Sequence, residues 1–506
     1  SLAIVVVFYV FRFLNYAYFQ PKKLDKLLRR NGFRGNEYKF LHGDLKEIAK
    51  ATKAGAGKPV NFEDDFKPRV YGFFLKTINA HGNCSFFWSG TRPTILINDA
   101  DLVKEILNKP DDYGKPLRTN PLQNLFIRGL VAHEGEKWTK HRRIMNPAFH
   151  LEKLKLMVPA FRMSAEEILY KWEGYASPDG SKEYDVWPDI QKITSDAISR
   201  TAFGSKYGDG RKIFQLLTEQ AANVVKSYQL PYIPGSQYLP TKMNRRMKEI
   251  ERELQTLISG LIDQRINSMK AGEPMSNDLL GIMLESNFQE MKQNKSKNSG
   301  MTLDDIAEEC KLFYFGGQET TSILLVWTVI LLSRYPEWQD KAREEVLSVF
   351  GNQPPHYDGL NQLKIVTMIL NEVLRLYPPV PAYGRRAKEE IKLGKYTLPK
   401  DATVQLQILL LHHNTKIWGD DALRFNPERF SEGVVKAQKV PGVFFPFGYG
   451  ARMCIGQSFT MVEARVVLAM MLQKFSFQLS SSYVHAPFAT MTIKPQHGAP
   501  LILHKL

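Results

Sequence analysis

The sequence contains few cysteines. Cys84, Cys310 and Cys454 are the only ones in 506 residues, and no two of them form a CxxC pair. This scarcity excludes a secreted module held together by disulfides, and it disfavours a zinc site built on four cysteines or on paired cysteines and histidines. A reducing compartment is therefore expected, in which one of the three can still act as a reactive or ligating group.

The sequence also has no internal repeat and no dominant low-complexity segment. Hydrophobic residues make up 43% of the chain and charged residues 24%, so we expect a folded chain with a large core. Length alone favours three or four domains. The net charge of +16 indicates an acidic partner, an anionic membrane or nucleic acid, without distinguishing among them.

The N-terminal segment is apolar but interrupted. Residues 1–10 read SLAIVVVFYV, and after Arg12 the apolar character continues to Phe19. A full span needs about 20 apolar residues, so this stretch falls short and predicts a truncated signal anchor over residues 1–20. Lysines and arginines follow it, which places the rest of the chain on the cytosolic side. The alternatives are a cleaved signal peptide or a buried segment, but no small-residue cleavage site follows.

Hydrophobic periodicity predicts mostly helix with small sheets. We expect a strand and then a helix over 93–107, long helices over 136–269, strands over 391–409, and a terminal hairpin that turns at 496–500. The polar stretch Lys292–Gly300 predicts a surface loop. The apolar loop Leu230–Pro240 either dips into a bilayer or packs on its own domain.

The most informative stretch is FFPFGYGARMCIGQ, residues 444–457. It fits the pattern F-x-x-G-x-R-x-C-x-G at Phe447, Gly450, Arg452, Cys454 and Gly456. A thiolate is a strong electron donor to iron, and in haem it favours O–O cleavage. Gly448 and the other glycines let backbone N–H groups approach and stabilise the thiolate. Phe447 is expected to shield the sulfur and Arg452 to meet an anionic group of the cofactor. The plainer interpretation is a buried structural cysteine, but a pattern with five specified positions rarely arises by chance.

This loop resembles the haem-binding signature of the cytochromes P450. Other motifs of that family follow in the family's order from about residue 20 to the end of the chain. The phrase GEKWTKHRRIMNPAFHLEKLK, residues 135–155, resembles a plant clade that contains secologanin synthase and terpenoid or triterpenoid oxidases. The resemblance implies one large domain over residues 21–506, mainly α with small β-sheets (α+β), and haem b with Cys454 as the axial ligand of its iron.

A second motif lies in the middle of a helix expected over 302–334, with Thr302 as its N-cap. FGGQETTS, residues 315–322, places Gly316 and Thr320 one turn apart, so the threonine hydroxyl can bond the glycine carbonyl. Glu319 adds a carboxylate, and the two groups can relay protons during dioxygen activation. Read alone, the segment is equally a glycine kink with a solvated glutamate. It resembles the family's A/G-G-x-D/E-T-T/S element, which implies catalytic roles for these residues.

Further residues gain a role from the resemblance. Glu372 and Arg375 lie at i,i+3 on one helix face, and alone they would be a surface pair worth under about 1 kcal/mol. The family pattern implies a buried structural network of this pair with Arg429. Trp138 and Arg142 resemble the W-x-x-x-R pair that meets a haem propionate, and Arg385 resembles another propionate arginine, with Arg386 beside it as an alternative. Three histidines lack metal-ligand spacing and are left without a role: His141, His412 and His413.

Substrate contacts are expected in the variable regions of the family. These are the loop 121–130, part of the helix over 302–334, the segment 380–384 and the expected hairpin tip at 496–499. Their mostly apolar character suits a terpenoid skeleton. The residues named are Phe313, Phe315, Val380, Ala382, Tyr383 and His497.

Together these features predict a monooxygenase anchored in the endoplasmic reticulum membrane and facing the cytosol. It would insert one oxygen of O2 into a C–H bond of a lipophilic plant terpenoid or iridoid, by hydroxylation or oxidative ring cleavage. Electrons would come from NADPH through NADPH-cytochrome P450 reductase, with cytochrome b5 as a further candidate partner. Lys137, Lys140 and Arg143 are expected to help dock the reductase. A monomer that binds membrane lipid and no nucleic acid is expected.

Two alternatives stay open on the residues. One is a haem-thiolate isomerase or lyase that rearranges hydroperoxides without a redox partner; it would not need the proton relay, and the presence of Glu319 and Thr320 disfavours it. The other is a haem sensor or nucleic-acid-binding protein, suggested by the net charge of +16. The dispersed charges and the lack of a recognisable nucleic-acid module disfavour it. The motifs from Trp138 to Cys454 must meet at one haem, so the expectation from length of three or four domains gives way to one.

Overall fold

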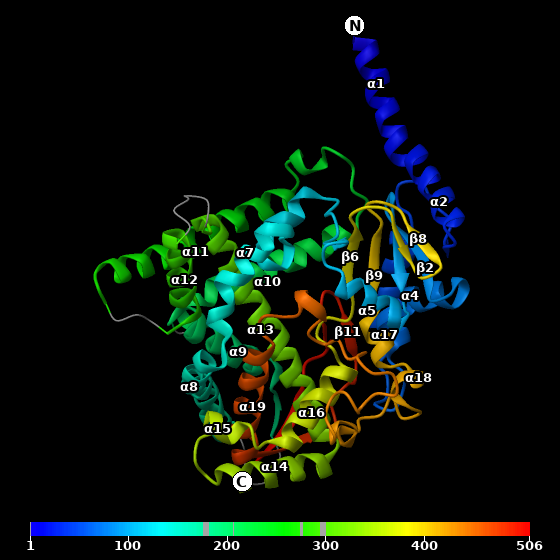
Figure 1. Ribbon diagram of the computed structural model, residues 1–506. Helices are drawn as coiled ribbons and strands as arrows, with labels where there is room; N and C mark the ends of the chain where they lie inside the picture. The colour runs from blue at the N-terminus through cyan, green and yellow to red at the C-terminus, as the bar shows by residue number, and fades with distance from the viewer. Residues whose placement is uncertain (1, 176–181, 206, 274–276, 294–299) are drawn as a thin grey trace.

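The computed structural model describes residues 2–175, 182–205, 207–273, 277–293 and 300–506. Helices form most of the molecule, and small sheets lie to one side of them (Figure 1). This arrangement confirms the predicted fold class of one large, mainly helical domain with small sheets. Most of the surface loop predicted at Lys292–Gly300 lies outside the described residues.

The N-terminal helix projects from the body of the molecule (Figure 1). It runs through α1 (Leu2–Leu14), a π-helical turn (Asn15–Phe19) and α2 (Gln20–Arg30). Pro21 cannot donate to the carbonyl of Ala17, and the Tyr38 hydroxyl donates to that carbonyl instead, at 2.5 Å. The apolar segment is therefore part of a longer helix than the expected anchor over residues 1–20. Leu2–Arg30 is long and apolar enough to cross a membrane, and only 6% of its most apolar window is buried.

The largest sheet has six strands in the order β1-β2-β3-β9-β6-β4. β1–β2 and β3–β9 are parallel pairs, and the other neighbours are antiparallel. The predicted strand and helix over 93–107 are confirmed as β3 and α5 (Ala100–Asn108). The strands are β1 (Arg34–Gly35), β2 (Cys84–Ser89), β3 (Arg92–Ile97), β4 (Tyr113–Gly114), β6 (Tyr383–Ala387) and β9 (Thr403–Leu406).

The predicted terminal hairpin is wrong. β12 (Ile493–Pro495) pairs with β11 (Pro487–Ala489), whereas β13 (Pro500–Lys505) joins β10 (Phe475–Leu479) and β5 (Glu183–Asp185). The chain leaves one sheet for another between β12 and β13, where Gly498 has a positive φ of 78° and Asp185 accepts the Ala499 N–H at 2.8 Å. The strands predicted over 391–409 are found as β7 (Ile391–Leu393), β8 (Tyr396–Leu398) and β9. The last residues of that range, however, begin α17 (Ile408–His412).

The longest helix, α13 (Leu303–Arg334), crosses the middle of the molecule (Figure 1). Thr302 and Asp305 form a capping box at its start, as its position as an N-cap predicts. α13 packs against α9 (Trp187–Phe203) and α19 (Gln457–Lys474), and α19 also packs against α8 (Leu151–Tyr175). α13 is also long and apolar enough to cross a membrane, but 72% of its most apolar stretch is buried inside the protein, so it is a core helix.

Two hydrophobic cores lie on either side of the segment that leads to Cys454. The larger core belongs to the helices and the smaller one to the six-stranded sheet. Phe444 packs against both cores, Phe445 is fully buried in the sheet core, and Phe447 packs against the helical core. The loop that carries Cys454 therefore starts at the boundary between the two. Cys84 and Cys310 are buried, as expected for small hydrophobic residues.

Candidate active site

The cysteine loop folds back on itself through its own backbone. The Cys454 N–H donates to the Phe447 carbonyl at 2.8 Å, and the Met453 N–H donates to Gly450 at 3.1 Å. Gly448 and Gly450 have positive φ values of 80° and 69°. A Cβ atom on Gly450 would lie 2.8 Å from the Leu107 carbonyl oxygen, so only glycine fits this close approach.

The Cys454 thiol combines exposure with a raised pKa. Its side chain is exposed rather than packed, yet surrounding protein raises the pKa of the thiol by burial. Both observations hold if the sulfur lines a space inside the protein instead of bulk solvent. The Gly456 N–H and the charge of Arg142 act in the opposite direction and lower the thiol pKa. Both effects favour the thiolate form of Cys454.

One face of α13 is open in the middle of an otherwise buried helix. Its half-buried positions recur about one turn apart, which indicates a single stripe along the helix. They are Leu312, Phe315, Gly316, Glu319 and Thr320, whereas the half-buried Gly317 lies off this stripe. A Cβ atom on Gly316 would meet only Leu312, at 3.8 Å, whereas one on Gly317 would lie 2.8 Å from Ile198 on α9. Gly316 therefore borders open space and Gly317 allows close helix packing.

The predicted pairing of Gly316 with Thr320 is present. The Thr320 hydroxyl donates to the Gly316 carbonyl at 2.7 Å. The neighbouring Glu319 turns towards the β11–β12 hairpin, where the Thr492 hydroxyl donates to its carboxylate at 2.8 Å and Lys494 lies 3.8 Å away. Sequence reasoning missed Thr492, because the expected hairpin tip was placed several residues too late. The turn that reaches α13 is at Thr490–Thr492.

Three cations gather beside the cysteine loop. Burial and the nearby Arg385 and Arg452 lower the pKa of Lys115 to about 7, and burial together with Arg452 lowers that of Arg385 to about 10. None of the three forms an ion pair within the part of the chain that the structure describes. The nearby Glu134 carboxylate raises the pKa of Lys115 and Arg452, but it pairs with Arg386 at 3.5 Å. Desolvated cations this close together call for an anion. The two propionates of haem b fit this requirement. Lys115 is the one of the three cations that sequence reasoning missed.

The structure also separates Arg385 from its neighbour. Arg386 pairs with Asp401 at 2.6 Å and with Glu134 at 3.5 Å. Arg385 is buried and donates to the Gly384 carbonyl at 2.8 Å. Its lack of a carboxylate among the described residues favours Arg385 over Arg386 as a propionate ligand.

Trp138 and Arg142 on α7 (Gly135–Met145) reach the same loop. The Arg452 guanidinium lies over the Trp138 ring, 4.2 Å from its centroid. Arg142 donates to the Met453 carbonyl at 3.0 Å. Burial lowers the pKa of Arg142 while Cys454 raises it, which places the guanidinium near the sulfur. The pair therefore supports the loop from one side.

Glu372 and Arg375 on α16 (Lys364–Leu376) are fully buried. The Arg375 Nε and Nη2 atoms donate to the Glu372 carboxylate at 2.7 and 2.8 Å. Arg429 lies 3.6 Å from Glu372 and donates to the Trp418 carbonyl at 2.6 Å. The three residues therefore form one buried network.

This network is connected to the cysteine loop by groups that sequence reasoning left aside. Arg375 donates to the His412 carbonyl at 2.8 Å, and the His412 Nε2 atom accepts the Phe445 N–H at 3.0 Å. The Tyr383 hydroxyl donates to the carbonyls of Phe445 at 2.7 Å and Pro446 at 3.1 Å. Tyr383 was named as a substrate contact, but its hydroxyl positions the start of the loop.

The remaining substrate candidates lie in different surroundings. Phe315 is half-buried and meets Phe126 edge to face at 4.8 Å. Phe313 is 5% exposed and packs within the core on Phe149. Val380 and Ala382 are half-buried, whereas His497 is exposed in the connection between β12 and β13. The structure thus places Phe315 on the open stripe of α13 and Phe313 off it.

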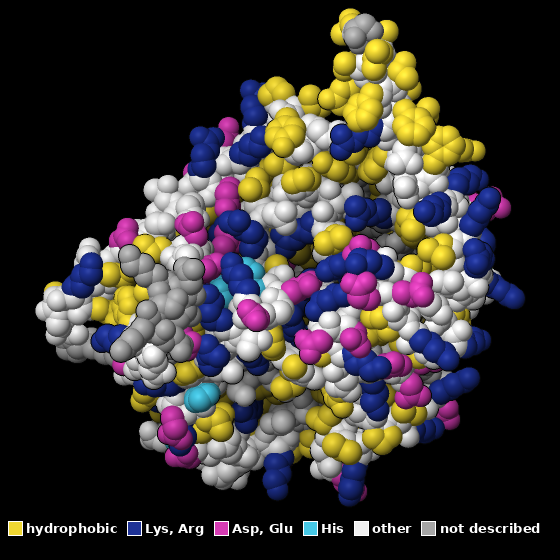
Figure 2. Space-filling view, turned by 45° about the horizontal axis from the view of Figure 1, so that its top comes forward, with side chains coloured by type: hydrophobic (Ala, Val, Ile, Leu, Met, Phe, Trp, Pro, Cys, Tyr) yellow, Lys and Arg dark blue, Asp and Glu magenta, His cyan; other side chains and the backbone are white. Residues whose placement is uncertain are grey.

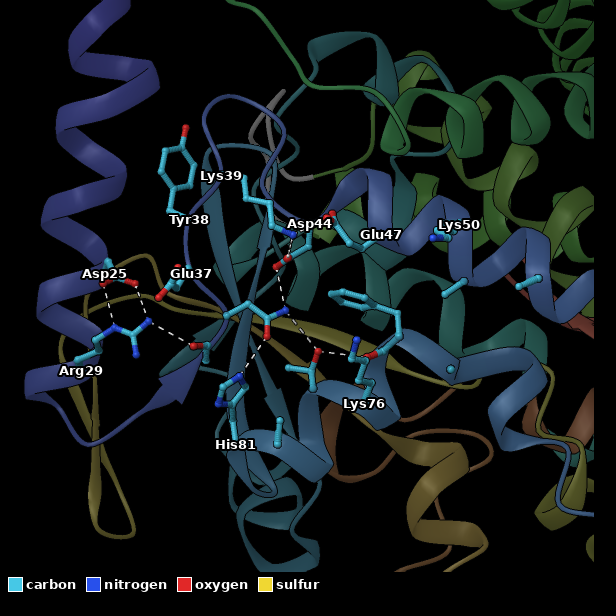
Figure 3. Close-up of a pocket in the computed structure, with 18 of the residues that line it drawn as sticks. Asp25, Arg29, Glu37, Tyr38, Lys39, Asp44, Glu47, Lys50, Lys76 and His81 are labelled. Atoms are coloured by element: carbon cyan, nitrogen blue, oxygen red, sulfur yellow. Dashed lines mark hydrogen bonds and ion pairs between the residues drawn. The ribbon is translucent and has the colours of Figure 1, made fainter.

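A surface cavity of about 1080 Å³ is a separate feature. It lies between α2, α3 (Leu45–Ala56) and α4 (Lys67–His81), as Figure 3 shows. Asp44 is buried at its wall, where it accepts the Trp88 N–H at 2.8 Å and an Asn36 amide hydrogen at 3.1 Å. These contacts tie the segment after the N-terminal helix to the sheet. None of the predicted site residues lines this cavity.

An exposed cysteine in a glycine-bearing loop, a threonine hydrogen-bonded to a glycine carbonyl of its own helix, and cations that form no ion pair among the described residues fit a haem-thiolate oxidoreductase of the monooxygenase class. A comparison with known protein families identifies the family. The chain belongs to the cytochrome P450 family, whose model matches residues 62–499.

Full-length relatives support this membership. The chain is 53% identical over 498 residues to Cytochrome P450 72A397 of Kalopanax septemlobus, covering 98% of this chain and 96% of that protein. It is 48% identical over 506 residues to 7-deoxyloganic acid hydroxylase of Catharanthus roseus, covering 99% and 97%. It is 49% identical over 503 residues to Cytochrome P450 72A15 of Arabidopsis thaliana, covering 99% and 97%. The predicted resemblance to this plant clade is confirmed.

Proposed function

We propose that this P450 hydroxylates a lipophilic plant terpenoid or iridoid, with electrons from NADPH delivered by NADPH-cytochrome P450 reductase. One relative is named as a 7-deoxyloganic acid hydroxylase, which motivates the iridoid part of the proposal. The observation that carries it is the Thr320–Gly316 hydrogen bond of 2.7 Å on the open stripe of α13. An enzyme that only rearranges a hydroperoxide has no use for a proton-delivering hydroxyl at this place.

The site residues have different proposed roles. Cys454 would hold the haem iron, and Lys115, Arg385 and Arg452 would hold the propionates. The thiolate-ligated haem, when bound, supplies the iron chemistry that activates dioxygen. Thr320 can hold and pass a proton at its hydroxyl, and Glu319 can supply one from the direction of Thr492 and Lys494. Phe315 and its apolar neighbours exclude water from the substrate.

Turnover with and without electrons tests the proposal. Full-length protein would be incubated with the reductase, NADPH and panels of iridoids, diterpenoids and triterpenoids, and products identified by mass spectrometry. A product one oxygen heavier that requires NADPH is expected. Thr320→Val should lower product formed per NADPH consumed by about 10- to 100-fold, while Thr328→Val on the same helix, whose hydroxyl donates to Leu324, serves as the matched control. Product formed from a hydroperoxide without NADPH would overturn the proposal.

The proposed location is the endoplasmic reticulum membrane, with the catalytic domain in the cytosol. The apolar N-terminal helix and the loop 230–240 support this. Hydrophobic side chains gather along α1 and on the adjoining surface (Figure 2). The exposed members of the loop are Leu230, Ile233, Tyr238 and Leu239.

The N-terminal helix and this loop are also joined, since the Tyr16 hydroxyl donates to the Tyr232 carbonyl at 2.7 Å. We therefore expect both to enter the same bilayer. Ile233→Asp together with Leu239→Asp should reduce sedimentation with anionic vesicles, whereas Leu257→Asp, a half-exposed position on α11 (Lys242–Lys270), should not. Equal binding of all three proteins would mean that the loop packs on its own domain.

The reductase is proposed to dock on the face formed by α7. A groove of about 970 Å³ there is lined by Lys137, Lys140, Arg143 and Arg452, among others. Lys137 pairs with Asp305 at 2.6 Å and Arg143 with Glu290 at 2.5 Å, so part of the positive charge is already balanced. Lys137→Glu should slow haem reduction in a salt-dependent way, and Lys212→Glu on α10 (Tyr207–Tyr228) is the control. Unchanged reduction kinetics would contradict docking here.

A further inference from the structure

Two histidines and a carboxylate meet next to the cysteine loop. One ligand atom each of His133, His141 and Glu309 lies within 4.8 Å of the others. They come from three places in the chain: the segment before α7, α7 itself and α13. The His141 Nδ1 atom and the Glu309 Oε1 atom are 2.6 Å apart, and both side chains are fully buried.

The carboxylate of Glu309 has a defined orientation. The Leu130 N–H donates to its Oε2 atom at 2.9 Å, so its Oε1 atom faces His141. On the other side of the imidazole, the His141 Nε2 atom lies 3.9 Å from the Asp305 Oδ2 atom. Second carboxylates in this position orient a metal-binding histidine in many proteins.

The cluster is not satisfied by hydrogen bonds. The Nε2 atoms of His133 and His141 are both buried and have no hydrogen-bond partner among the described residues. The two rings pack edge to face, with centroids 4.5 Å apart. Buried polar atoms without partners are uncommon in native proteins and call for a ligand or another explanation. A cation that replaces the proton shared by His141 and Glu309 would also give the His133 nitrogen a partner.

We propose that His133, His141 and Glu309 form a binding site for a divalent cation of the zinc type. Two imidazoles and one carboxylate are a common set of protein ligands for Zn²⁺. Mg²⁺ and Ca²⁺ prefer oxygen ligands, and only one of the three residues offers oxygen. The cluster is enclosed by Leu130 and by Asp305, which supply a hydrogen bond and a second negative charge.

The site would connect to the haem region through one residue. The Arg452 Nη1 atom donates to the His133 carbonyl at 2.6 Å. A cation bound by the His133 ring would hold this carbonyl in place, and with it the arginine beside the cysteine loop. The site differs from the haem site in its residues and in its ligand chemistry.

Zinc binding to the haem-loaded, full-length protein tests the proposal. The protein is purified without a histidine tag, dialysed against a chelator, and titrated with Zn²⁺ in competition with a chromophoric chelator. About one equivalent is expected to bind the unmodified protein. His133→Ala removes a half-buried side chain whose Nε2 atom has no hydrogen bond among the described residues, so the fold should survive. We expect at least a tenfold weaker binding.

The matched control is His150→Ala, which changes an exposed histidine beyond the end of α7 and should leave binding unchanged. The reduced carbon monoxide spectrum reports whether each variant retains its haem. Zinc-edge X-ray absorption should show two imidazole ligands in the unmodified protein and fewer in His133→Ala. Equal zinc affinity in the two proteins, or no binding to the unmodified protein at micromolar zinc, would overturn the site. The cluster would then be a hydrogen-bonded pair only.

Discussion

Two buried polar clusters hold the cysteine loop from opposite ends. At its start, Phe445 is bound by His412, which belongs to the Glu372–Arg375 network. Near Cys454, Arg452 is bound by the carbonyl of His133, which belongs to the cluster with His141 and Glu309. Each cluster contains two buried nitrogens without a hydrogen bond among the described residues, on Arg429 and His412 in the first and on His133 and His141 in the second. The difference lies in their central residues, Arg375 and His141, which are both fully buried.

The central residue of the first cluster is saturated. Arg375 donates five hydrogen bonds, two to Glu372 and three to the carbonyls of His412, Ala422 and Arg424. The central residue of the second cluster, His141, has a hydrogen-bonded Nδ1 atom. Its Nε2 atom has no hydrogen bond among the described residues and lies 3.9 Å from the Asp305 carboxylate. An arginine with every donor paired is held in one geometry. A ring nitrogen without a hydrogen bond can still take a ligand, so the equal burial of Arg375 and His141 does not imply equal roles.

The largest effect should come from breaking the cluster around Arg375. Arg375→Ala leaves the Glu372 carboxylate buried without its partner, which should cost about 3–5 kcal/mol of unfolding free energy. Urea unfolding of the haem-loaded protein measures this cost. Arg246→Ala removes an exposed arginine that pairs with Glu219, and should cost about 1 kcal/mol or less. Similar losses for both variants would show that burial of the network adds no stability.

Acid should weaken the same cluster. Burial, followed by the charge of Arg375, lowers the pKa of His412 to about 3, below its ordinary value of 6.5. Between these values the unfolded chain binds a proton that the native protein does not, so stability falls as pH decreases below 6.5 and is unaffected above it. The expected slope for one histidine is about 1.4 kcal/mol per pH unit.

Replacing His412 by Asn keeps an acceptor for the Phe445 N–H and removes the titrating ring. Urea unfolding between pH 4.5 and 6.5 should therefore have a shallower pH slope in His412→Asn, by about one proton. His485, whose pKa burial also lowers to about 3, contributes equally to both proteins. Identical slopes would mean that His412 is charged in the native protein.

The cluster around His141 should lose less stability when its carboxylate, Glu309, is removed. Glu309→Ala leaves the Leu130 N–H and the His141 Nδ1–H without their acceptor, at a cost of about 1–3 kcal/mol. Glu309→Gln keeps an acceptor oxygen, so it should cost less. Thermal and urea unfolding in the absence of added metal measure both. A loss as large as that of Arg375→Ala would remove the distinction between the clusters.

The smallest effect is expected where a single hydroxyl supports the loop. Tyr383→Phe removes the hydrogen bonds to Phe445 and Pro446 and should cost about 0.5–1.5 kcal/mol. Haem should dissociate faster, whereas the spectral shift caused by substrate should keep its midpoint concentration. A changed midpoint concentration of substrate with an unchanged rate of haem loss would indicate that Tyr383 contacts the substrate.

The sequence predicted best where partners are close along the chain. Gly316 and Thr320 are four residues apart, Glu372 and Arg375 three, and the Cys454 loop closes on itself. Local spacing determines such contacts, because helix and turn geometry set which neighbours meet. The plant P450 clade could be recognised from the sequence for the same reason, because its motifs are short and contiguous.

The errors and omissions involve contacts between distant segments. The terminal hairpin was wrong because β13 pairs with β10 and β5 rather than with β12. Lys115 was missed because its neighbours Arg385 and Arg452 are far along the chain. His141 was left without a role, since its partner Glu309 is 168 residues away and no spacing rule connects them.

The sequence by itself determined the family, the folded-back cysteine loop, the hydrogen-bonded Gly316–Thr320 pair and the Glu372–Arg375 ion pair. Each depends on residues within one element, where backbone geometry fixes the relation. Among the described residues, the tertiary structure alone decided which cations lie together without an ion pair, which arginine of the 385–386 pair is buried, and which buried nitrogens have no hydrogen bond. These depend on burial and on long-range packing, because a charge or a ring nitrogen acquires its chemistry from everything folded around it.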